Sequence, residues 1–264
     1  MSSLYGRHAL VTGAGTGIGK AIAVSLATAG ATVTICGRTE STLAAACEQI
    51  AADGSGEASY VIADVTSEGS VEEACAAASS ESGELHICVA NAGGGGMLGR
   101  LHTQDAAEFD RVLRLNVTGT FLTMKHALPR MIRAGGGAFV AISSIAGHLT
   151  HPFFGAYPPG KAGIEQLVRN AADEYGADGI RCNAIRPGFV ATEIMDVIPR
   201  DSEIYDSYVR NTPLGRLGEP ADIAALARFL VSDEAEWLTG AVIDLDGGQS
   251  LRRGPNYQLF AAPG

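Results

Sequence analysis

The chain has 264 residues, 46% of them hydrophobic and 18% charged, which excludes an intrinsically disordered protein. A chain of this length buries about three quarters of its unfolded surface, so it needs no disulfide or metal to be stable. The net charge of −10 comes with no basic stretch, which argues against nucleic acid or an anionic membrane as a partner.

Cysteine usage and the first residues of the chain predict a cytoplasmic protein. Residues 1–10 contain no apolar run typical of a signal peptide, and no segment approaches the roughly 18 apolar residues of a membrane span. The histidines show no metal-ligand pairing, so no metal is expected. The cysteines are odd in number and lack C-x-x-C spacing, which fits neither a disulfide framework nor a zinc site. We interpret them as small buried hydrophobic residues: Cys36, Cys47, Cys75, Cys88 and Cys182.

Short β-rich segments alternate with helical patterns along the chain. This alternation predicts an α/β fold, a doubly wound (Rossmann) parallel seven-stranded sheet with helices on both faces. No linker, repeat or charge block interrupts it, so we expect a single domain over residues 1–264. The expected strands are 9–11, 31–36, 59–62, 86–90, 138–142, 180–185 and 241–245. The expected helices are 17–29, 41–52, 68–78, 106–133, 163–175 and 221–231.

Two features depart from this regular alternation. Pro129 lies late in the long helical pattern 106–133 and is predicted to kink or end that helix. Residues 191–217 mix proline, polar and apolar residues, and we interpret them as a substrate loop that acts as a lid. A tail, residues 251–264, follows the last expected strand.

A glycine-rich segment directly follows the first expected strand and opens a helix. Helix N-termini carry unpaired N–H groups and partial positive charge, which suit a pyrophosphate. The spacing, G-x-x-x-G-x-G from Gly13, is weak alone, but the strand before it and the helix after it are the context that such a motif requires. We predict dinucleotide binding, with a plain turn as the alternative. The residues concerned are Gly13, Gly15, Thr16, Gly17, Ile18 and Gly19.

Tyr157 and Lys161 are four residues apart, which on a helix places them one turn apart on one face. A cation beside the phenol favours the phenolate and lowers its pKa from about 10. A tyrosine tuned in this way can exchange a proton with a substrate oxygen near neutral pH. The pair alone is a common pattern, and two unrelated surface residues remain the alternative.

Polar residues and glycines gather where several expected strands end. In open parallel sheets, binding sites form at the carboxyl ends of the strands. We therefore expect these residues at one edge of the sheet: Asn91-Ala92-Gly93, Ser143-Ser144 and Pro187-Gly188, with Asn116 in the helical segment between the first two groups.

Taken together, these motifs resemble the short-chain dehydrogenases/reductases over essentially all of residues 7–250. In that family the catalytic serine precedes the tyrosine by thirteen residues, which selects Ser144 over Ser143. The resemblance rests on residues 12–19, Asp64-Val65, Asn91-Ala92-Gly93, Asn116-Val117, Ser144, Tyr157, Lys161, Pro187-Gly188 and Asp246-Gly247-Gly248.

The resemblance implies a catalytic tetrad that interconverts a secondary alcohol and a ketone with NAD(P). Tyr157 would donate a proton to a carbonyl or accept one from an alcohol, and Ser144 would bond the substrate oxygen. Lys161 would hold the nicotinamide ribose and lower the pKa of Tyr157, and Asn116 would position Lys161 through water. The protein supplies orientation and proton transfer, while the hydride chemistry belongs to the cofactor.

The resemblance also implies further cofactor contacts and an assembly. Asp64 and Val65 would contact the adenine, Thr192 would hold the carboxamide, and a homotetramer would form through the helix 106–133, the helix after Tyr157, and the last helix and strand. Apolar residues around these helices support such burial. The backbone of Asn91 and its neighbours Ala92 and Gly93 would contact the adenosine-side ribose. Pro187 and Gly188 are the remaining expected cofactor contacts.

One departure from the family pattern lies inside the tyrosine–lysine motif. Pro158, Pro159 and Gly160 stand where small helix formers are usual. Proline is tolerated only in the first turn of a helix, whose N–H groups are unbonded in any case. We therefore expect the helix to start close to Tyr157 and the site to survive.

The second expected strand ends Ile35-Cys36-Gly37-Arg38-Thr39, which bears on the choice of cofactor. NAD-binding sites usually carry an Asp or Glu here, about 20 residues past the glycine loop. Gly37 stands in its place, and the adjacent Arg38 can bind a 2′-phosphate bidentately. We predict NADP, with NAD and a merely solvated Arg38 as the alternative. Glu40 nearby and Thr16, where many NADP-dependent relatives have a second basic residue, weaken the case.

The substrate is a small carbonyl or alcohol that the sequence does not identify. Phe153, Phe154, Met97 and Met195 could line an apolar pocket, although core packing explains each equally well. Apolar residues in these loops favour a hydrophobic or alicyclic ketone. Residues 93–96 are expected at the cleft rim. His148 and His151 are interpreted as exposed loop residues, with a substrate contact as the alternative because both lie between Ser144 and Tyr157. The alternative functions are a catalytically silent dinucleotide sensor, which would have no reason to keep the tetrad, and dehydratase or epimerase chemistry.

Overall fold

A computed structural model of the protein describes residues 3–52, 56, 58–193 and 198–251. At its centre lies one seven-stranded parallel sheet in the order β3-β2-β1-β4-β5-β6-β7. This confirms the predicted fold class. The strands are β1 (His8–Thr12), β2 (Thr32–Gly37), β3 (Ala58–Ile62), β4 (Ile87–Ala90), β5 (Gly137–Ile142), β6 (Ile180–Pro187) and β7 (Val242–Leu245).

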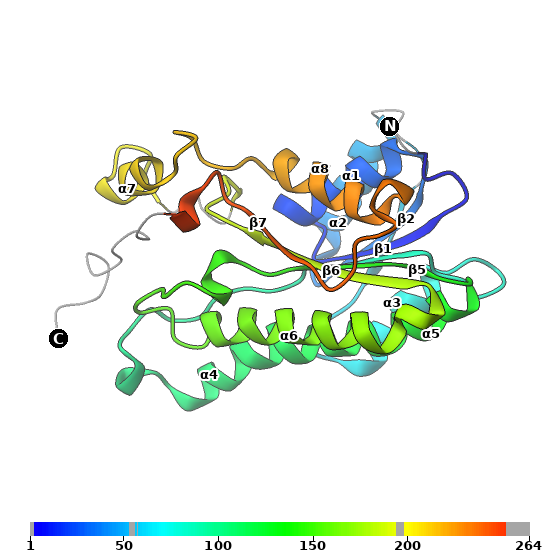
Figure 1. The fold of residues 1–264 in the computed structure, drawn as a ribbon, viewed down its shortest axis with the longest axis horizontal. Coiled ribbons are helices and arrows are strands. Elements are labelled where there is room, and N and C mark those ends of the chain that lie inside the picture. Colours follow the sequence, from blue (N-terminus) through cyan, green and yellow to red (C-terminus); the bar gives the residue numbers. More distant parts are fainter. Residues whose placement is uncertain (1–2, 53–55, 57, 194–197, 252–264) are drawn as a thin grey trace.

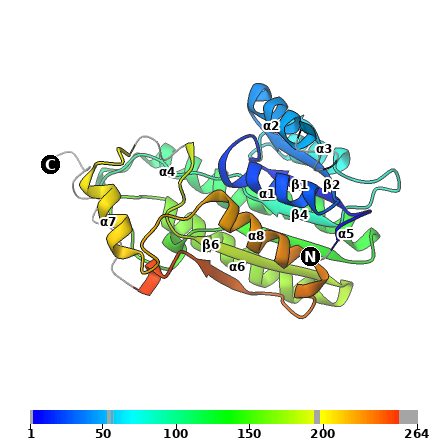
Figure 2. The same ribbon diagram turned by 90° about the horizontal axis from the view of Figure 1, so that it is seen from above.

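Helices cover both faces of the sheet (Figures 1 and 2). Neighbouring strand residues point to opposite faces, so Val11 packs into one core and Leu10 into the other. Strands buried on both sides consist of almost continuous apolar residues for this reason. One face carries α1 (Gly17–Thr28), α2 (Glu40–Ala52) and α8 (Pro220–Val231). The other carries α3 (Glu68–Ala77), α4 (Ala106–Leu113), α5 (Gly119–Arg133) and α6 (Tyr157–Tyr175).

Strand order places a crevice in the middle of the sheet. β1 pairs with β2 on one side and with β4 on the other, so the connections after β1 and β4 leave toward opposite faces. Ligands of open parallel sheets bind at such a switch point, outside the carboxyl ends of the strands. The glycine loop follows β1 and the segment 91–96 follows β4, so both lie at this crevice.

The long helical segment 106–133 is interrupted, but not at Pro129, where the sequence predicted a kink or an end. A π-helical turn, Arg114–Thr118, separates α4 from α5, and Asn116 is completely buried within it. α5 continues past Pro129 to Arg133, so the proline does not end the helix. Pro129 has no backbone N–H, so the helix loses one hydrogen bond there. The burial of Leu128 and Met131, on either side of the proline, offsets the lost stability.

α6 begins at Tyr157, six residues before the helical pattern 163–175. Pro158 and Pro159 lie in its first turn, where their missing N–H groups have no helical acceptor in any case. The expectation that this helix starts close to Tyr157 is confirmed. The excursion 191–217 is not all loop, because it contains α7 (Glu203–Asn211).

Four of the five cysteines are buried as expected, whereas Cys47 is only half-buried. All five are free thiols. Within the described part of the chain, no helix has both the length and the apolar character to cross a membrane, and no His, Cys, Asp and Glu side chains cluster in a way that could hold a metal.

Candidate active site

A cleft of about 750 Å³ opens at the carboxyl ends of the strands. Ser144 and every residue predicted to bind the cofactor line it, whereas Asn116 lies buried beneath its floor. The predicted rim, residues 93–96, also lines the cleft. The predicted lining residues are Gly13, Gly15, Thr16, Gly17, Ile18, Gly19, Arg38, Asp64, Val65, Asn91, Ala92, Gly93, Ser144, Tyr157, Lys161, Pro187, Gly188 and Thr192.

The glycine loop leaves the N-terminus of α1 open to the cleft. Thr16 is the N-cap residue, yet its side chain makes no capping hydrogen bond, so the first-turn N–H groups remain available to an anion. Gly13 has a φ of 63°, and a Cβ there would lie 2.8 Å from Cα of Ala92. Only glycine allows this backbone conformation together with so close an approach.

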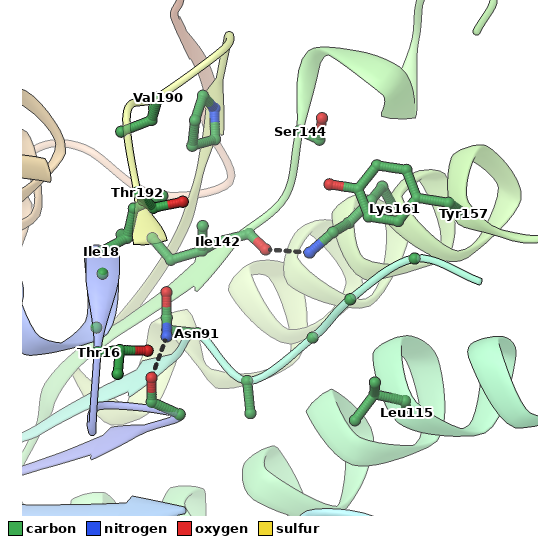
Figure 3. Close-up of a pocket in the computed structure, with 18 of the residues that line it drawn as sticks. Thr16, Ile18, Asn91, Leu115, Ile142, Ser144, Tyr157, Lys161, Val190 and Thr192 are labelled. Atoms are coloured by element: carbon green, nitrogen blue, oxygen red, sulfur yellow. Dashed lines mark hydrogen bonds between the residues drawn. The ribbon is translucent and has the colours of Figure 1, made fainter. Parts of the chain in front are cut away.

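Asn91 ties the glycine loop to β4. Its Nδ2 donates to the carbonyl oxygens of Thr12 and Gly13, both at 3.0 Å, and its backbone N–H donates to the Thr12 hydroxyl at 3.0 Å. The side chain is therefore occupied by the protein itself (Figure 3). Asn91 thus holds two loops together, and the predicted cofactor contact would have to come from its backbone and its neighbours.

Three predicted catalytic side chains converge at the other end of the cleft (Figure 3). Ser144 follows β5, while Tyr157 and Lys161 occupy the first turns of α6. Lys161 Nζ donates to the carbonyl oxygen of Ile142 at 2.9 Å and lies 5.6 Å from the centroid of the Tyr157 ring. The sequence spacing of these residues thus corresponds to one cluster in space.

The electrostatics of Tyr157 differ from the prediction. Burial raises the pKa of Tyr157 above 10, and a hydrogen bond with Ser144 acts in the opposite direction. Lys161 was expected to lower this pKa. Instead, its ammonium is buried beside the Ile142 carbonyl, and burial lowers the pKa of Lys161 to about 8. Desolvation therefore dominates both groups, because each loses the water that would stabilise its charged form.

The depressed pKa of Lys161 makes folding stability depend on pH. Between about pH 8 and 10.5 the folded protein has lost a proton that the unfolded chain still holds, so the contribution of this group to stability rises with pH. Below about pH 8 the lysine is charged in both states, so the whole free-energy cost of burying its charge reduces the stability of the folded protein. We expect Lys161→Met to gain stability relative to wild type at pH 7, and this advantage to shrink by about 2–3 kcal/mol by pH 10.

Urea unfolding of both proteins at the two pH values measures this difference. Lys125→Met, at a lysine with a half-exposed side chain, serves as the control and should show no such trend. A stability difference between wild type and Lys161→Met that is independent of pH would contradict the depressed pKa.

Asn116 connects the π-helical turn to the glycine segment after β4. Its Nδ2 donates to the carbonyl oxygens of Gly94 at 2.8 Å and Val112 at 2.9 Å, and its Oδ1 accepts the Gly94 N–H at 3.3 Å. A Cβ on Gly93 would lie 2.7 Å from Oδ1 of Asn116 and 3.1 Å from Nζ of Lys161. Glycine at 93 thus lets the backbone pass between the two side chains.

A buried ion pair behind Lys161 was missed by sequence reasoning. Glu165, 3% exposed, accepts from Nε of Arg186 at 2.7 Å and from Nη2 at 2.5 Å. It also accepts the Ser143 hydroxyl at 2.8 Å, and that hydroxyl lies 3.2 Å from the Lys161 carbonyl oxygen. The network joins the end of β5 to α6 and β6. Its only sequence signal is the position of Glu165 one helical turn after Lys161.

The apolar pocket residues were only partly predicted. Phe154 lines the cleft, whereas Met97 is exposed and Phe153 packs beside α7 instead; Met195 lies outside the described residues. His151 was interpreted as exposed, but it is half-buried and lines the cleft, because the segment around it folds back toward Tyr157. Further lining residues without a sequence signal include Leu98, Ile142, Phe189, Val190, Ile198, Tyr208 and Gln249.

At the β2 end of the cleft, Arg38 is exposed and lines the wall with Asp64. Thr66 donates its backbone N–H and hydroxyl to Oδ1 of Asp64, at 2.9 and 2.8 Å, and these bonds lower the pKa of Asp64. Glu40 accepts from the Tyr60 hydroxyl at 3.3 Å and is not part of the lining. The acid nearest in sequence to Arg38 is therefore engaged elsewhere.

Comparison with known proteins decides the family. A family model described as enoyl-(acyl carrier protein) reductase matches residues 13–250. A solved short-chain type dehydrogenase/reductase from Mycobacterium ulcerans is 43% identical, with a TM-score of 0.95 over 98% of this chain and 94% of that one. The chain is a short-chain dehydrogenase/reductase. It is accordingly an oxidoreductase, and its family supports NAD(P)-dependent interconversion of alcohols and ketones.

Characterised members of this short-chain dehydrogenase/reductase family differ in substrate. A cis-4-hydroxycyclohexanecarboxylate dehydrogenase of Sinomonas cyclohexanicum is 39% identical over 245 residues, 92% of this chain and 96% of that protein. A 7alpha-hydroxysteroid dehydrogenase of Escherichia coli K12 is 36% identical over 245 residues, 93% and 94% of the two chains. Solved relatives include one with bound NADP and one with NADH, so family membership leaves the cofactor open.

Proposed function

We propose that this protein reduces a ketone to a secondary alcohol, or oxidises the alcohol, with Tyr157 as general acid and base. The observation that carries the proposal is one cleft with two chemically distinct ends. The uncapped N-terminus of α1 lies at one end, and Ser144, Tyr157 and Lys161 converge at the other. Such a cleft suits a dinucleotide and a small carbonyl side by side.

The residues present fit a nicotinamide dinucleotide. Residues 13–19 would receive the pyrophosphate at the N-terminus of α1, and Lys161, with one of its three donors on Ile142, would use another on the nicotinamide ribose. Thr192 lies close to the glycine loop, since a Cβ added at Gly17 would be 3.3 Å from its methyl group, and it would hold the carboxamide. When bound, the nicotinamide supplies or accepts the hydride.

The remaining chemistry is proton transfer by this chain's own side chains. In the reducing direction the Tyr157 hydroxyl donates its proton to the carbonyl oxygen, and in the oxidising direction the phenolate accepts it back. The Ser144 hydroxyl holds the same oxygen and stabilises the phenolate by hydrogen bonding. Lys161 supplies a positive charge near the Tyr157 ring. Asn116 fixes residues 93–94, which pass beside Lys161.

A panel of ketones and secondary alcohols, assayed with NADPH, NADH and their oxidised forms through the absorbance of the reduced nicotinamide, tests this function. Turnover of at least one carbonyl–alcohol pair is expected. Tight cofactor binding without any turnover would instead favour the silent dinucleotide sensor. The convergence of all three reactive side chains in one cleft favours the enzyme, because a sensor has no need of it.

NADP is the proposed cofactor because Arg38 lines the β2 end of the cleft where an NAD site usually has an acid. A guanidinium can bind the 2′-phosphate through two hydrogen bonds, whereas an aspartate would repel it. We expect Arg38→Asp to reduce the preference for NADPH over NADH by at least about tenfold, or to reverse it. Fluorescence titration with both cofactors measures this ratio. Tighter binding of NADH by the wild-type protein would refute the assignment.

A homotetramer in the cytoplasm is the proposed state. Large apolar side chains stay exposed on the elements expected to form its interfaces, including Phe121 on α5 and Phe229 on α8, 48% and 40% exposed. A closed symmetric assembly would bury them. Multi-angle light scattering at micromolar concentration is expected to give four times the chain mass of 27.2 kDa. The mass of a monomer would contradict the proposal. We further propose that residues 191–217 close over the substrate.

A further inference from the structure

Aromatic and aliphatic side chains form one continuous wall of the cleft beyond Tyr157. Ile198 and Tyr208 belong to a small core, and Phe154 and Phe189 pack against it. The rings of Phe189 and Tyr208 stack with centroids 3.9 Å apart. His151 joins this wall through Phe154, with ring centroids at 5.5 Å in an edge-to-face arrangement. We name it the aromatic wall; it comprises His151, Phe154, Phe189, Ile198 and Tyr208, all of which line the cleft.

Charged side chains lie elsewhere in the described lining of the cleft. Arg38 and Asp64 are at the ends of β2 and β3, and Glu193 pairs with Lys20 of α1 at 3.8 Å. Lys161 is buried against Ile142. Apolar walls favour the burial of a hydrocarbon framework, and a carboxylate buried without a partner is strongly disfavoured. The aromatic wall thus suits a neutral molecule.

The backbone holds His151 on the same side as the catalytic tyrosine. The N–H of Phe154 donates to the His151 carbonyl at 3.3 Å, and the N–H of Tyr157 donates to the Phe154 carbonyl at 3.1 Å. Phe153 adopts a φ of 73°, an uncommon conformation for a residue with a side chain, and its carbonyl accepts the Gly99 N–H at 2.9 Å. Such strain persists only where the surrounding structure enforces it, often at ligand sites.

The imidazole of His151, a residue of the cleft lining, has one acceptor that the described protein does not use. Its Nδ1 lies 3.2 Å from the carbonyl oxygen of Leu149, an acceptor only, so Nδ1 carries the proton in that bond. Burial lowers the pKa of His151, so the ring is neutral at physiological pH. In that tautomer Nε2 is a hydrogen-bond acceptor, and no residue of the described ranges bonds to it.

We propose that the substrate is a neutral cyclic ketone or secondary alcohol with a second hydroxyl group, whose ring packs on the aromatic wall and whose second hydroxyl donates to Nε2 of His151. The inference rests on the proposed function, because it assumes that the reacting oxygen lies at Tyr157 and Ser144. It adds the substrate class and makes His151 the residue that determines specificity.

Three ring ketones that differ only in the substituent opposite the carbonyl separate the possibilities: cyclohexanone, 4-hydroxycyclohexanone and 4-oxocyclohexanecarboxylate. We expect kcat/KM for the hydroxyketone to exceed that for cyclohexanone by about three- to tenfold, as one net hydrogen bond provides. The carboxylate should be the poorest of the three. A hydroxyketone no better than cyclohexanone, or a carboxylate that is the best substrate, would overturn the proposal.

Variants of His151 test its part in this preference. His151→Leu should bring the hydroxyketone-to-ketone ratio of kcat/KM close to one, and His151→Gln, which keeps an acceptor oxygen, should retain part of the preference. His148→Leu is the matched control, since that histidine lies on the same segment but outside the cleft lining, and should leave the ratio unchanged. An unchanged ratio in His151→Leu would contradict the assignment. Cofactor titration of each variant shows that it is folded.

Failure of this inference can be distinguished from failure of the proposed function. If the enzyme reduces an open-chain ketone such as 2-butanone but none of the ring ketones, the substrate class is wrong and the proposed function stands. If the protein binds the reduced cofactor but oxidises it with none of the carbonyl compounds tested, the proposed function fails as well.

Discussion

Replacing Tyr157 with phenylalanine is expected to lower kcat by a factor of about 10² to 10⁴ while changing the dissociation constant of the cofactor by no more than about threefold. The substitution removes one hydroxyl group and keeps the ring in its pocket at the start of α6. Without that hydroxyl, the cleft loses the proposed proton donor beside Ser144.

Lys161→Ala provides the contrast, because this side chain is proposed to serve both catalysis and binding. Its loss should lower kcat and also weaken cofactor binding by at least about tenfold. Single-turnover rates and fluorescence titrations of both variants test the pair together. A Tyr157→Phe enzyme with nearly wild-type kcat would refute the general acid assignment, and unchanged cofactor affinity in Lys161→Ala would refute the ribose contact.

Glu165→Ala is expected to destabilise the folded protein by about 3–5 kcal/mol, the usual consequence of removing one member of a buried ion pair. The carboxylate is 3% exposed and holds both the Arg186 guanidinium and the Ser143 hydroxyl. Without it, and among the described residues, the guanidinium keeps its longer contact with Asp244, at 3.3 Å, and the hydroxyl keeps the Lys161 carbonyl.

Urea unfolding of Glu165→Ala and of Lys125→Ala measures this effect against a matched control. Lys125 pairs with Glu68 on the surface, where both side chains are about half exposed, so its loss should cost less than about 1 kcal/mol. If the two substitutions had equal effects, the buried network would not contribute to stability as its geometry indicates. Because Ser143 precedes Ser144, we also expect Glu165→Ala to impair catalysis.

Local spacing carried most of the correct predictions. The choice of Ser144 came from the family resemblance, but the glycine segment needs only a strand before it and a helix after it, and the four-residue interval between Tyr157 and Lys161 places both on α6. Both patterns involve residues close in sequence, whose geometry the helix and strand repeats determine. The alternation of elements predicted the parallel sheet for the same reason, with strand and helix ends displaced by a few residues.

Properties that sum over distant neighbours could not be predicted in this way. The predicted shift in the pKa of Tyr157 was wrong in direction. Burial depends on every residue packed around the ring, whereas sequence spacing identifies only Lys161. Glu165 and Arg186 are 21 residues apart and belong to different elements, so no periodicity links them. His151 was interpreted as exposed because nothing local shows that its loop folds back against Phe154.

The π-helical turn Arg114–Thr118 limits which deletions this segment can accept. Such a turn has i→i+5 hydrogen bonds, occurs as a single-turn bulge inside an α-helix, and often lies at a functional site. Deleting one residue would let α4 and α5 join as a regular α-helix, with better hydrogen bonding than the wide turn allows. It would also rotate the helix on one side by about 100° and carry the Asn116 amide away from Gly94. At this point in the chain, a regular α-helix and the bond between Asn116 and Gly94 are therefore mutually exclusive.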